Sequence, residues 1–266
     1  PAAGKEGRTP MPHLALESVS LRYDGGAPVL SNVSLDITSG ELVVIVGRSG
    51  CGKTSLLNLA AGFLAPDSGR VLVDGRPVAG PGAERAVVFQ NDALFPWLST
   101  AENVAFAARL AGVSQAERRR QADRLLDIVG LAGLGDRPIW QLSGGQRQRV
   151  GLARALAANP AFLLMDEPLG ALDAMTREGM QDLLLNAWHQ SGAGTLLITH
   201  GVEEALYLAT RIVVMAPAPG RILRRLDVDF GRRRLAGESA RSIKSSPTFV
   251  AAREDLLDSI FEREAA

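Results

Sequence analysis

One stretch of the chain places glycines, a lysine and a threonine at the spacing that binds phosphate. Residues 47–54 fit the pattern G-x-x-x-x-G-K-[ST] at every fixed position, between an apolar run typical of a buried strand and a segment that favours a helix. Backbone N–H groups at the start of such a helix attract phosphate. Lys53 would reach the β- and γ-phosphates of a nucleotide, and the Thr54 hydroxyl would ligate Mg²⁺. The expected nucleotide contacts are Gly47, Arg48, Ser49, Gly50, Cys51, Gly52, Lys53, Thr54 and Ser55.

A second apolar run ends in two carboxylates. Residues 162–165 are apolar and are followed by Asp166 and Glu167. Beside a phosphate loop, such a strand supplies an acid that holds Mg²⁺ and a neighbouring acid that addresses the attacking water. We assign Asp166 to the metal and Glu167 to the water. The alternative is a strand that simply exits into polar residues, and it would leave the phosphate loop without a carboxylate for Mg²⁺.

A second anion-binding feature lies in the middle of the chain. A serine and two glycines precede a predicted helix, so a hydroxyl and free N–H groups lie together at a helix N-terminus. One chain does not need two phosphate sites for one nucleotide. We therefore expect this segment to serve the nucleotide bound by another subunit. Its residues are Ser143, Gly144, Gly145 and Gln146.

The composition excludes several classes of protein. With 266 residues, 46% of them hydrophobic and 22% charged, the chain can form one large domain with an ample core. Its formal net charge is zero, so no overall field draws it to nucleic acid or anionic lipid. A single cysteine excludes a disulfide framework. No apolar run approaches the roughly 18 residues that cross a bilayer, so action at a membrane would require a partner.

The order of the predicted elements indicates a parallel sheet with additions. Short β-type segments between residues 14 and 35 indicate antiparallel strands. A capping box at Ser99 opens a helix that we expect to reach Gly112, within a helical region of about 99–157. Strands and helices then alternate from 161 to 215, which is typical of a parallel sheet.

Both ends of the chain differ from its middle. Residues 1–12 hold three prolines and few apolar side chains, so we expect a disordered leader, with Met11 as a candidate translation start. The tail, residues 231–266, is expected to carry one helix from Pro247 that docks on the body. The expected buried face of that helix is Leu256, Leu257, Ile260 and Phe261.

These motifs have the order and spacing found in the ABC ATPases, which the chain resembles from about residue 14 to 215. The segments that carry the resemblance are residues 47–54, Gln90, residues 142–149, 166–168 and 171–173, and His200. The resemblance implies an α/β fold over 13–230: a P-loop ABC ATPase domain with a RecA-like parallel-sheet core, an N-terminal antiparallel β subdomain and an inserted helical subdomain. It also implies a head-to-tail homodimer that holds two ATP molecules, each between one subunit's phosphate loop and the other's signature, Ser143–Gln146.

The resemblance also gives single residues a role. Tyr23 matches the position whose ring stacks on adenine; packing on the neighbouring hairpin is the alternative. Gln90 matches the residue that contacts Mg²⁺ and the attacking water, and His200 matches the histidine at the γ-phosphate. Gly201 departs from the family pattern, in which an acidic residue usually follows that histidine. The expected catalytic residues are Glu167, His200 and Gln90, and the expected Mg²⁺ contacts are Thr54, Gln90 and Asp166.

A narrower likeness indicates an importer. Segments 80–85, 89–97 and 168–173 resemble the ATPase subunits of the nitrate/sulfonate/taurine importers, and residues 235–245 resemble those that import taurine. This implies an ATP-hydrolysing subunit at the cytoplasmic face of a bacterial inner membrane, bound to two permease subunits and indirectly served by a periplasmic substrate-binding protein. Taurine is the expected substrate, with aliphatic sulfonate or nitrate as alternatives. An ABC ATPase acting on nucleic acid or ribosomes is disfavoured, because the sequence has no coiled-coil insertion, second ATPase domain or basic footprint.

Two further expectations concern exposed side chains. Large apolar residues follow Gln90, and we expect Leu94, Phe95 and Trp97 to form a groove that receives a short helix of the permease. Ordinary core packing is the alternative. Cys51 lies inside the phosphate loop, and we expect its thiol to be partly open to solvent and reactive toward maleimide unless ATP covers it.

Overall fold

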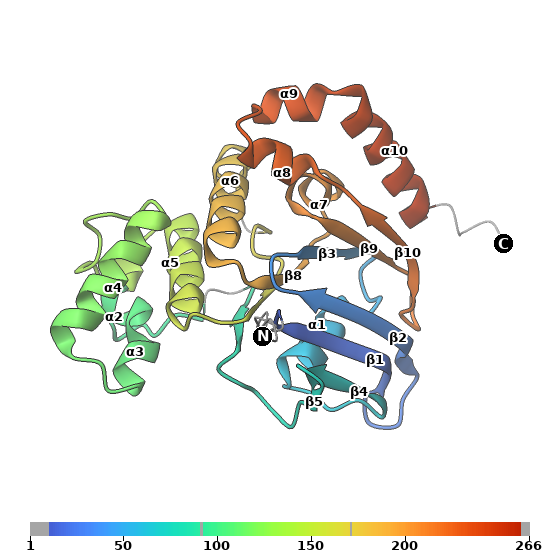
Figure 1. The fold of residues 1–266 in the computed structure, drawn as a ribbon, viewed down its shortest axis with the longest axis horizontal. Coiled ribbons are helices and arrows are strands. Elements are labelled where there is room, and N and C mark those ends of the chain that lie inside the picture. The colour runs from blue at the N-terminus through green and yellow to red at the C-terminus, as the bar shows by residue number, and fades with distance from the viewer. Residues whose placement is uncertain (1–10, 91–92, 171, 262–266) are drawn as a thin grey trace, which may run out of the picture.

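The computed structural model describes residues 11–90, 93–170 and 172–261. Residues 1–10 of the expected leader lie outside the described residues, as do Asn91, Asp92 and Ala171 of the segments that carry the family resemblance. The described chain forms a central sheet with helices, a second sheet beside it and a group of helices at one end (Figure 1).

The central sheet has six strands in the order β10-β9-β3-β8-β7-β6, and only the pair β10 and β9 is antiparallel. Both of its faces are covered. Leu42, Val44 and Val46 of β3 pack with α6 and α7, whereas Val43 and Ile45 pack with α1 and the second sheet. Burial on both faces is why the sequence of β3 is continuously apolar. The bounds are β3 Leu42–Gly47, β6 Arg85–Val88, β7 Phe162–Asp166, β8 Gly194–Ile198, β9 Arg211–Met215, β10 Ile222–Asp227, α1 Lys53–Ala61, α6 Ala174–Ser191 and α7 Val202–Leu208.

The second sheet is antiparallel, in the order β2-β1-β4-β5. Its inner face shares a core with α1 and the central sheet, while its outer face is polar. Leu14, Leu16 and Ile37 are fully enclosed in this core. The bounds are β1 His13–Arg22, β2 Pro28–Thr38, β4 Ser68–Val73 and β5 Arg76–Pro77.

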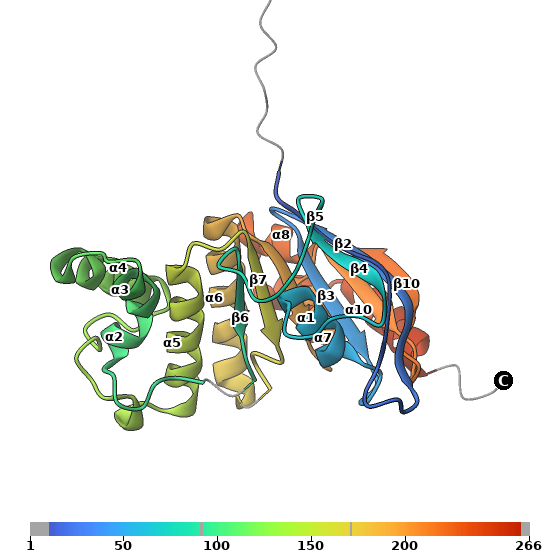
Figure 2. The same ribbon diagram turned by 90° about the horizontal axis from the view of Figure 1, so that it is seen from below.

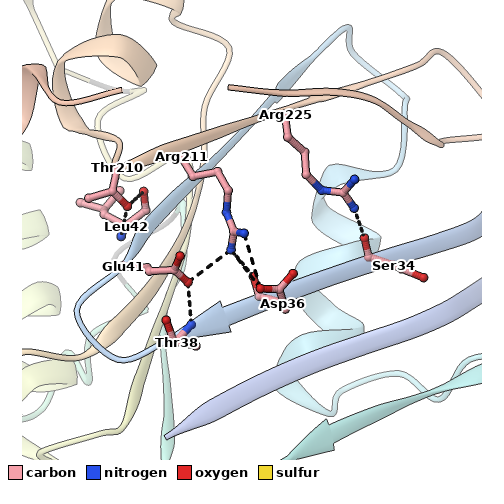
Figure 3. A network of polar contacts seen from close by, with 8 residues as sticks. All are labelled: Ser34, Asp36, Thr38, Glu41, Leu42, Thr210, Arg211 and Arg225. Atoms are coloured by element: carbon pink, nitrogen blue, oxygen red, sulfur yellow. Dashed lines mark hydrogen bonds and ion pairs between the residues drawn. The ribbon is translucent and has the colours of Figure 1, made fainter. Parts of the chain in front are cut away.

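A polar joint ties the second sheet to one edge of the central sheet (Figure 3). Arg211, at the start of β9, donates from Nη2 to the backbone oxygen of Asp36 at 2.6 Å and pairs with the Glu41 carboxylate at 3.2 Å. Arg225 of β10 donates to the backbone oxygen of Ser34 at 2.6 Å. These contacts join residues about 170 to 190 positions apart, so they fix the orientation of one sheet on the other.

The helical group is inserted between the neighbouring parallel strands β6 and β7, and it lies to one side of both sheets (Figures 1 and 2). The single helix expected from Ser99 to Gly112 is wrong: the chain turns at Ala105, where ψ is 0°, and two short helices result. The expected capping box at Ser99 is present. The elements are α2 Thr100–Val104, α3 Phe106–Leu110, α4 Gln115–Ile128, the 3₁₀ turn η1 Ile139–Gln141, and α5 Gly144–Ala157.

The tail holds more structure than the sequence predicted. After β10 it forms α8 Phe230–Leu235, α9 Ala240–Ser245 and α10 Pro247–Phe261, which arch over α6 and α7 (Figure 1). The expected start of α10 at Pro247 is confirmed. Its buried face is only partly as expected: Leu256 is fully buried, but Phe261 is 59% exposed, and Phe249 fills the core instead.

The expected α/β architecture is therefore confirmed, with its parallel core, antiparallel sheet and helical insertion. Within the described ranges, none of the helices has the length and apolar character needed to span a bilayer.

Candidate functional site

The phosphate loop joins the end of β3 to α1, and its glycines are required by the backbone. Gly47 has a φ of 156°, and a Cβ there would lie 2.8 Å from the backbone oxygen of Met215. Gly52, the residue that caps α1, has a φ of 90°, and a Cβ there would lie 2.7 Å from Leu30 Cδ2. Any other residue would clash, so the loop can take this course only with glycine.

The lysine of the loop turns inward. Lys53 Nζ donates to the backbone oxygens of Gly47 at 2.8 Å and Arg48 at 3.0 Å. The ammonium thus lies inside the ring of the loop, where phosphate oxygens would replace or extend these contacts. The expectation of an open Cys51 is wrong: its side chain is fully buried and packs with the core under the loop, within 3.8 Å of Lys53 Nζ. The thiol points into the protein because the loop wraps outward around the phosphate site.

A cavity of about 340 Å³ opens in front of this loop. It is lined by Val29, Ser49, Gly50, Gly52, Lys53, Thr54, Ser55, Glu167 and His200. Tyr23, in the turn after β1, is about half exposed, and its hydroxyl lies 3.0 Å from Ser55 Oγ at the start of α1. The structure thus brings the loop, the acid of β7 and the histidine after β8 around one space, beside an exposed aromatic ring.

Three expected catalytic residues meet at one carboxylate oxygen. Gln90 Nε2 donates to Glu167 Oε2 at 3.3 Å, and His200 Nδ1 lies 3.4 Å from the same oxygen. The three side chains follow β6, β7 and β8, whose carboxyl ends share one edge of the sheet, the usual place for a ligand in such folds. Glu167 has a φ of 46°. A non-glycine residue in that region costs about 1–3 kcal/mol and persists mainly at functional sites.

The carboxylate of Asp166 suits a divalent cation. Burial raises its pKa; the hydrogen bond with Thr54 opposes this shift, and the charge of Glu167 adds to it. A half-buried carboxylate with a raised pKa has too little positive charge around it, and a bound dication supplies that charge. Mg²⁺ is usually bound by one or two protein groups together with phosphate oxygens and water. Thr54 and Asp166 lie together here and can supply those protein groups.

The signature segment lies elsewhere in the fold. Ser143 caps α5 in a reciprocal capping box with Gln146: the Gln146 N–H donates to Ser143 Oγ at 3.3 Å, and the Ser143 N–H donates to Gln146 Oε1 at 2.9 Å. A Cβ on Gly145 would press on Leu172 and Thr176 at 3.2–3.3 Å. None of the residues 143–146 lines the cavity at the phosphate loop. The structure therefore does not bring these two expected sites together within one chain.

The residues after Gln90 divide between core and surface. Leu94 is buried, and its side chain belongs to the core beneath the helical group; its expected contact with the permease stays a prediction. Phe95 is half-buried between Trp97 and Phe106, with ring centroids 5.5 and 4.6 Å away. Trp97 is 75% exposed, which excludes core packing for this residue.

A buried asparagine that the sequence reading missed shapes the loop that carries Trp97. Asn103 is fully enclosed; its Oδ1 accepts the Phe95 N–H at 2.9 Å, and its Nδ2 donates to the backbone oxygens of Phe95, Leu98 and Ser99 at 3.0–3.4 Å. The sequence did contain one sign of this buried role: a polar residue lies between Ala101 and Val104, on the apolar face of a predicted helix.

Comparison with known proteins agrees with this geometry. The family model for ABC transporters matches residues 30–170. The chain is 62% identical over 257 residues to the taurine import ATP-binding protein TauB of Mesorhizobium japonicum. The aligned region covers 96% of this chain and all of that protein. It is 57% identical over 251 residues to the protein of the same name from Pseudomonas entomophila, covering 94% and 97% of the two chains.

Solved structures lead to the same class. A dimeric ATP-binding cassette, MJ0796, bound to ADP and phosphate, superposes with a TM-score of 0.72 at 32% identity over 81% of this chain and 98% of that chain. The cbiO1 protein from Clostridium perfringens, part of the ABC transporter complex cbiONQ, gives 0.75 at 26% identity over 91% and 98%. The chain belongs to the ABC transporter family as an ATP-binding subunit, as its motifs predicted. Within that family, the curated relatives described above are ATP-binding proteins for taurine import.

Proposed function

We propose that this chain is the ATP-hydrolysing subunit of a bacterial taurine importer, coupling ATP + H₂O to the inward movement of taurine, with release of ADP and phosphate inside. Identity above 55% over nearly the whole length to several taurine import ATP-binding proteins supports this substrate over aliphatic sulfonate or nitrate. The subunit works as a homodimer at the cytoplasmic face of the inner membrane, bound to two permease subunits and reached indirectly by a periplasmic substrate-binding protein.

The observation that carries the hydrolytic role is the convergence of Gln90 and His200 on Glu167 beside the phosphate loop. Residues 47–55 hold the phosphates, with the ring of Tyr23 against adenine. Glu167 holds and polarises the attacking water, Gln90 orients it, and His200 contacts the γ-phosphate.

Thr54, Asp166 and Gln90 hold the magnesium ion that accompanies ATP. When bound, Mg²⁺ neutralises phosphate charge as it develops in the transition state. Ser143–Gln146 close on the nucleotide of the opposite subunit, which accounts for their absence from this chain's own cavity.

A glutamine substitution tests the hydrolytic role. Glu167→Gln keeps the shape of the side chain and should keep ATP affinity, while turnover falls by about 10²–10⁴-fold, the range for a positioned acid–base group. The ATP-bound dimer should then accumulate, as measured by gel filtration with ATP and Mg²⁺. Glu254→Gln, on the surface of α10, is the matched control. Normal hydrolysis by Glu167→Gln would remove this residue from the mechanism.

Uptake measurements test the substrate. Labelled taurine, an alkanesulfonate and nitrate are offered to a strain that lacks this subunit and to the same strain with the subunit restored. We expect restoration of taurine uptake above all. Restoration of nitrate or alkanesulfonate uptake alone would refute the assignment of taurine and leave the ATPase role intact.

A further inference from the structure

A second cavity, of about 520 Å³, lies under the tail and beside the nucleotide cavity. Its walls come from α6, from the start of α7 and from the tail helices α9 and α10, which arch over α6 and α7 (Figure 1). Its volume is typical of sites for small molecules. His200 lines both this tail cavity and the cavity in front of the phosphate loop, so the two spaces meet at one side chain.

Most of the charged side chains around the tail cavity are paired with one another. Lys244 Nζ of α9 lies 2.9 Å from Glu178 Oε1 of α6. Arg253 Nη1 of α10 lies 3.1 Å from Glu203 Oε1 of α7. These two ion pairs fasten the tail to the body, and their charges are already balanced without a ligand.

Two charged side chains of the tail cavity, Arg177 and Glu204, have opposite signs and remain outside these pairs. Arg177 Nη2 donates to the backbone oxygen of Leu172 at 2.7 Å, and within the described part of the chain no carboxylate forms an ion pair with this guanidinium. Glu204 is only 7% exposed, and its Oε1 is enclosed without a hydrogen-bond partner among the described residues. Enclosing a carboxylate oxygen without a donor is costly, so the cavity should be built for a group that supplies one.

A single ligand can satisfy both side chains if it carries two charges. An ammonium donates hydrogen bonds to a carboxylate, and a sulfonate or carboxylate group accepts them from a guanidinium. A ligand with only one charge would leave either Arg177 or Glu204 without its partner. Burial also raises the pKa of the Glu204 carboxyl, and a bound ammonium would favour its charged form.

We propose that the tail cavity binds a small zwitterion, with its ammonium at Glu204 and its acidic group at Arg177, and that this occupant slows ATP hydrolysis by contacting His200. Taurine, an ammonium joined to a sulfonate by two carbons, belongs to this class. Its assignment as the occupant rests on the proposed function, in which taurine is delivered to the inside of the cell. The tail cavity would then sense the product of transport.

The effect on hydrolysis follows from the position of His200 between the two cavities. Its Nδ1 lies 3.4 Å from Glu167 Oε2, and most of its side chain is exposed. An acidic group bound beside the ring would compete for it with Glu167 and with the γ-phosphate. ATP affinity should be unchanged, because the phosphate loop does not line the tail cavity. We expect saturating taurine to lower kcat at least about fivefold, the low end of typical coupling between two sites.

Calorimetric titration of the purified full chain without nucleotide tests the binding site. The probes are taurine, β-alanine, ethanesulfonate and ethylammonium, so two carry both charges and two carry one. Taurine should bind at least about tenfold more tightly than either single-charge probe, since each of these lacks one set of charge-assisted hydrogen bonds. Glu204→Gln and Arg177→Gln should each weaken taurine binding by at least about tenfold, and Arg177→Lys by less. Two exposed positions of the tail, in Arg241→Gln and Asp258→Asn, are the matched controls and should bind as the wild type does.

Each arm of the experiment can overturn one part of the proposal. Ethanesulfonate or ethylammonium binding as tightly as taurine, or unchanged taurine binding by Glu204→Gln, would exclude a zwitterion site. If circular dichroism shows that a variant is unfolded, the single-charge probes on the wild type still decide. Taurine that binds without lowering kcat would exclude the regulatory step, and β-alanine binding without taurine binding would exclude taurine as the occupant. The uptake experiment identifies the imported substrate independently, so failure of the tail cavity leaves the proposed function intact.

Discussion

Replacing Phe249 by alanine should destabilise the whole subunit, although this residue lies in the tail. Its side chain is 1% exposed and meets the ring of Phe230 edge to face, with centroids 5.0 Å apart. Both rings belong to the hydrophobic cluster that includes Leu206 and Tyr207 of α7. Truncating a buried phenylalanine typically costs about 3–5 kcal/mol, through lost burial and the cavity left behind. For a domain of about this size, that loss lowers Tm by roughly 6–20 °C.

Thermal and urea unfolding would measure this effect, with fluorescence and circular dichroism followed in parallel. Val250→Ala, on the exposed side of the same helix, is the control and should change the free energy of unfolding by no more than about 0.5 kcal/mol. ATP hydrolysis at low temperature should be retained in both variants. A Phe249→Ala protein as stable as the control would refute the reasoning, because the tail would then not share a cooperative core with the body.

Three further predictions concern the surface, pH and the thiol. Trp97→Ala should weaken association with the permease by about 2 kcal/mol in pull-down titrations while ATP affinity stays constant; unchanged association would exclude this surface. Burial acts to raise the pKa of Asp182, but the hydrogen bonds from Arg234 and Tyr207 outweigh it and lower the pKa. A lowered carboxyl pKa stabilises the fold above the unfolded-state value of about 3.9 and loses this effect as pH falls through the folded value. Urea unfolding of Asp182→Asn should therefore show equal destabilisation at pH 7 and 5 and less at pH 3.5. A loss of unfolding free energy that is the same at all three pH values would contradict a lowered pKa for Asp182. Cys51, being fully buried, should react with maleimide far more slowly in the native protein than in urea, with or without ATP; rapid native labelling would contradict this burial.

The chemistry of this chain was easier to predict from sequence than its packing. A phosphate loop depends on local spacing and local backbone geometry, so residues 47–54 could be found from eight letters and their flanks. Strand β7 and the two acids at its end could likewise be found from the local sequence. The thiol of Cys51 was misjudged because local spacing does not say toward which side of a loop a side chain points.

The parts that the sequence did not predict are those that depend on tertiary contacts. Helices α8 and α9 have six residues each, too few for a helical period to be recognised. Strand β10 carries arginines at two successive positions, because it is an edge strand with little burial. Arg211 and Asp36 pair across 175 positions of the chain, and the local sequence around neither residue indicates this contact.

The hydrogen bonds of the Asn103 amide bear on the rate at which a partner binds and on the lifetime of the complex. Its four hydrogen bonds to the backbone between Phe95 and Ser99 hold the loop that presents Trp97 in one shape before any partner arrives. Ordering flexible side chains at an interface typically costs about 0.5–1.5 kcal/mol each, and a rigid loop avoids much of that entropy loss. Changes in this surface should therefore alter the lifetime of the proposed complex with the permease far more than the rate at which it forms.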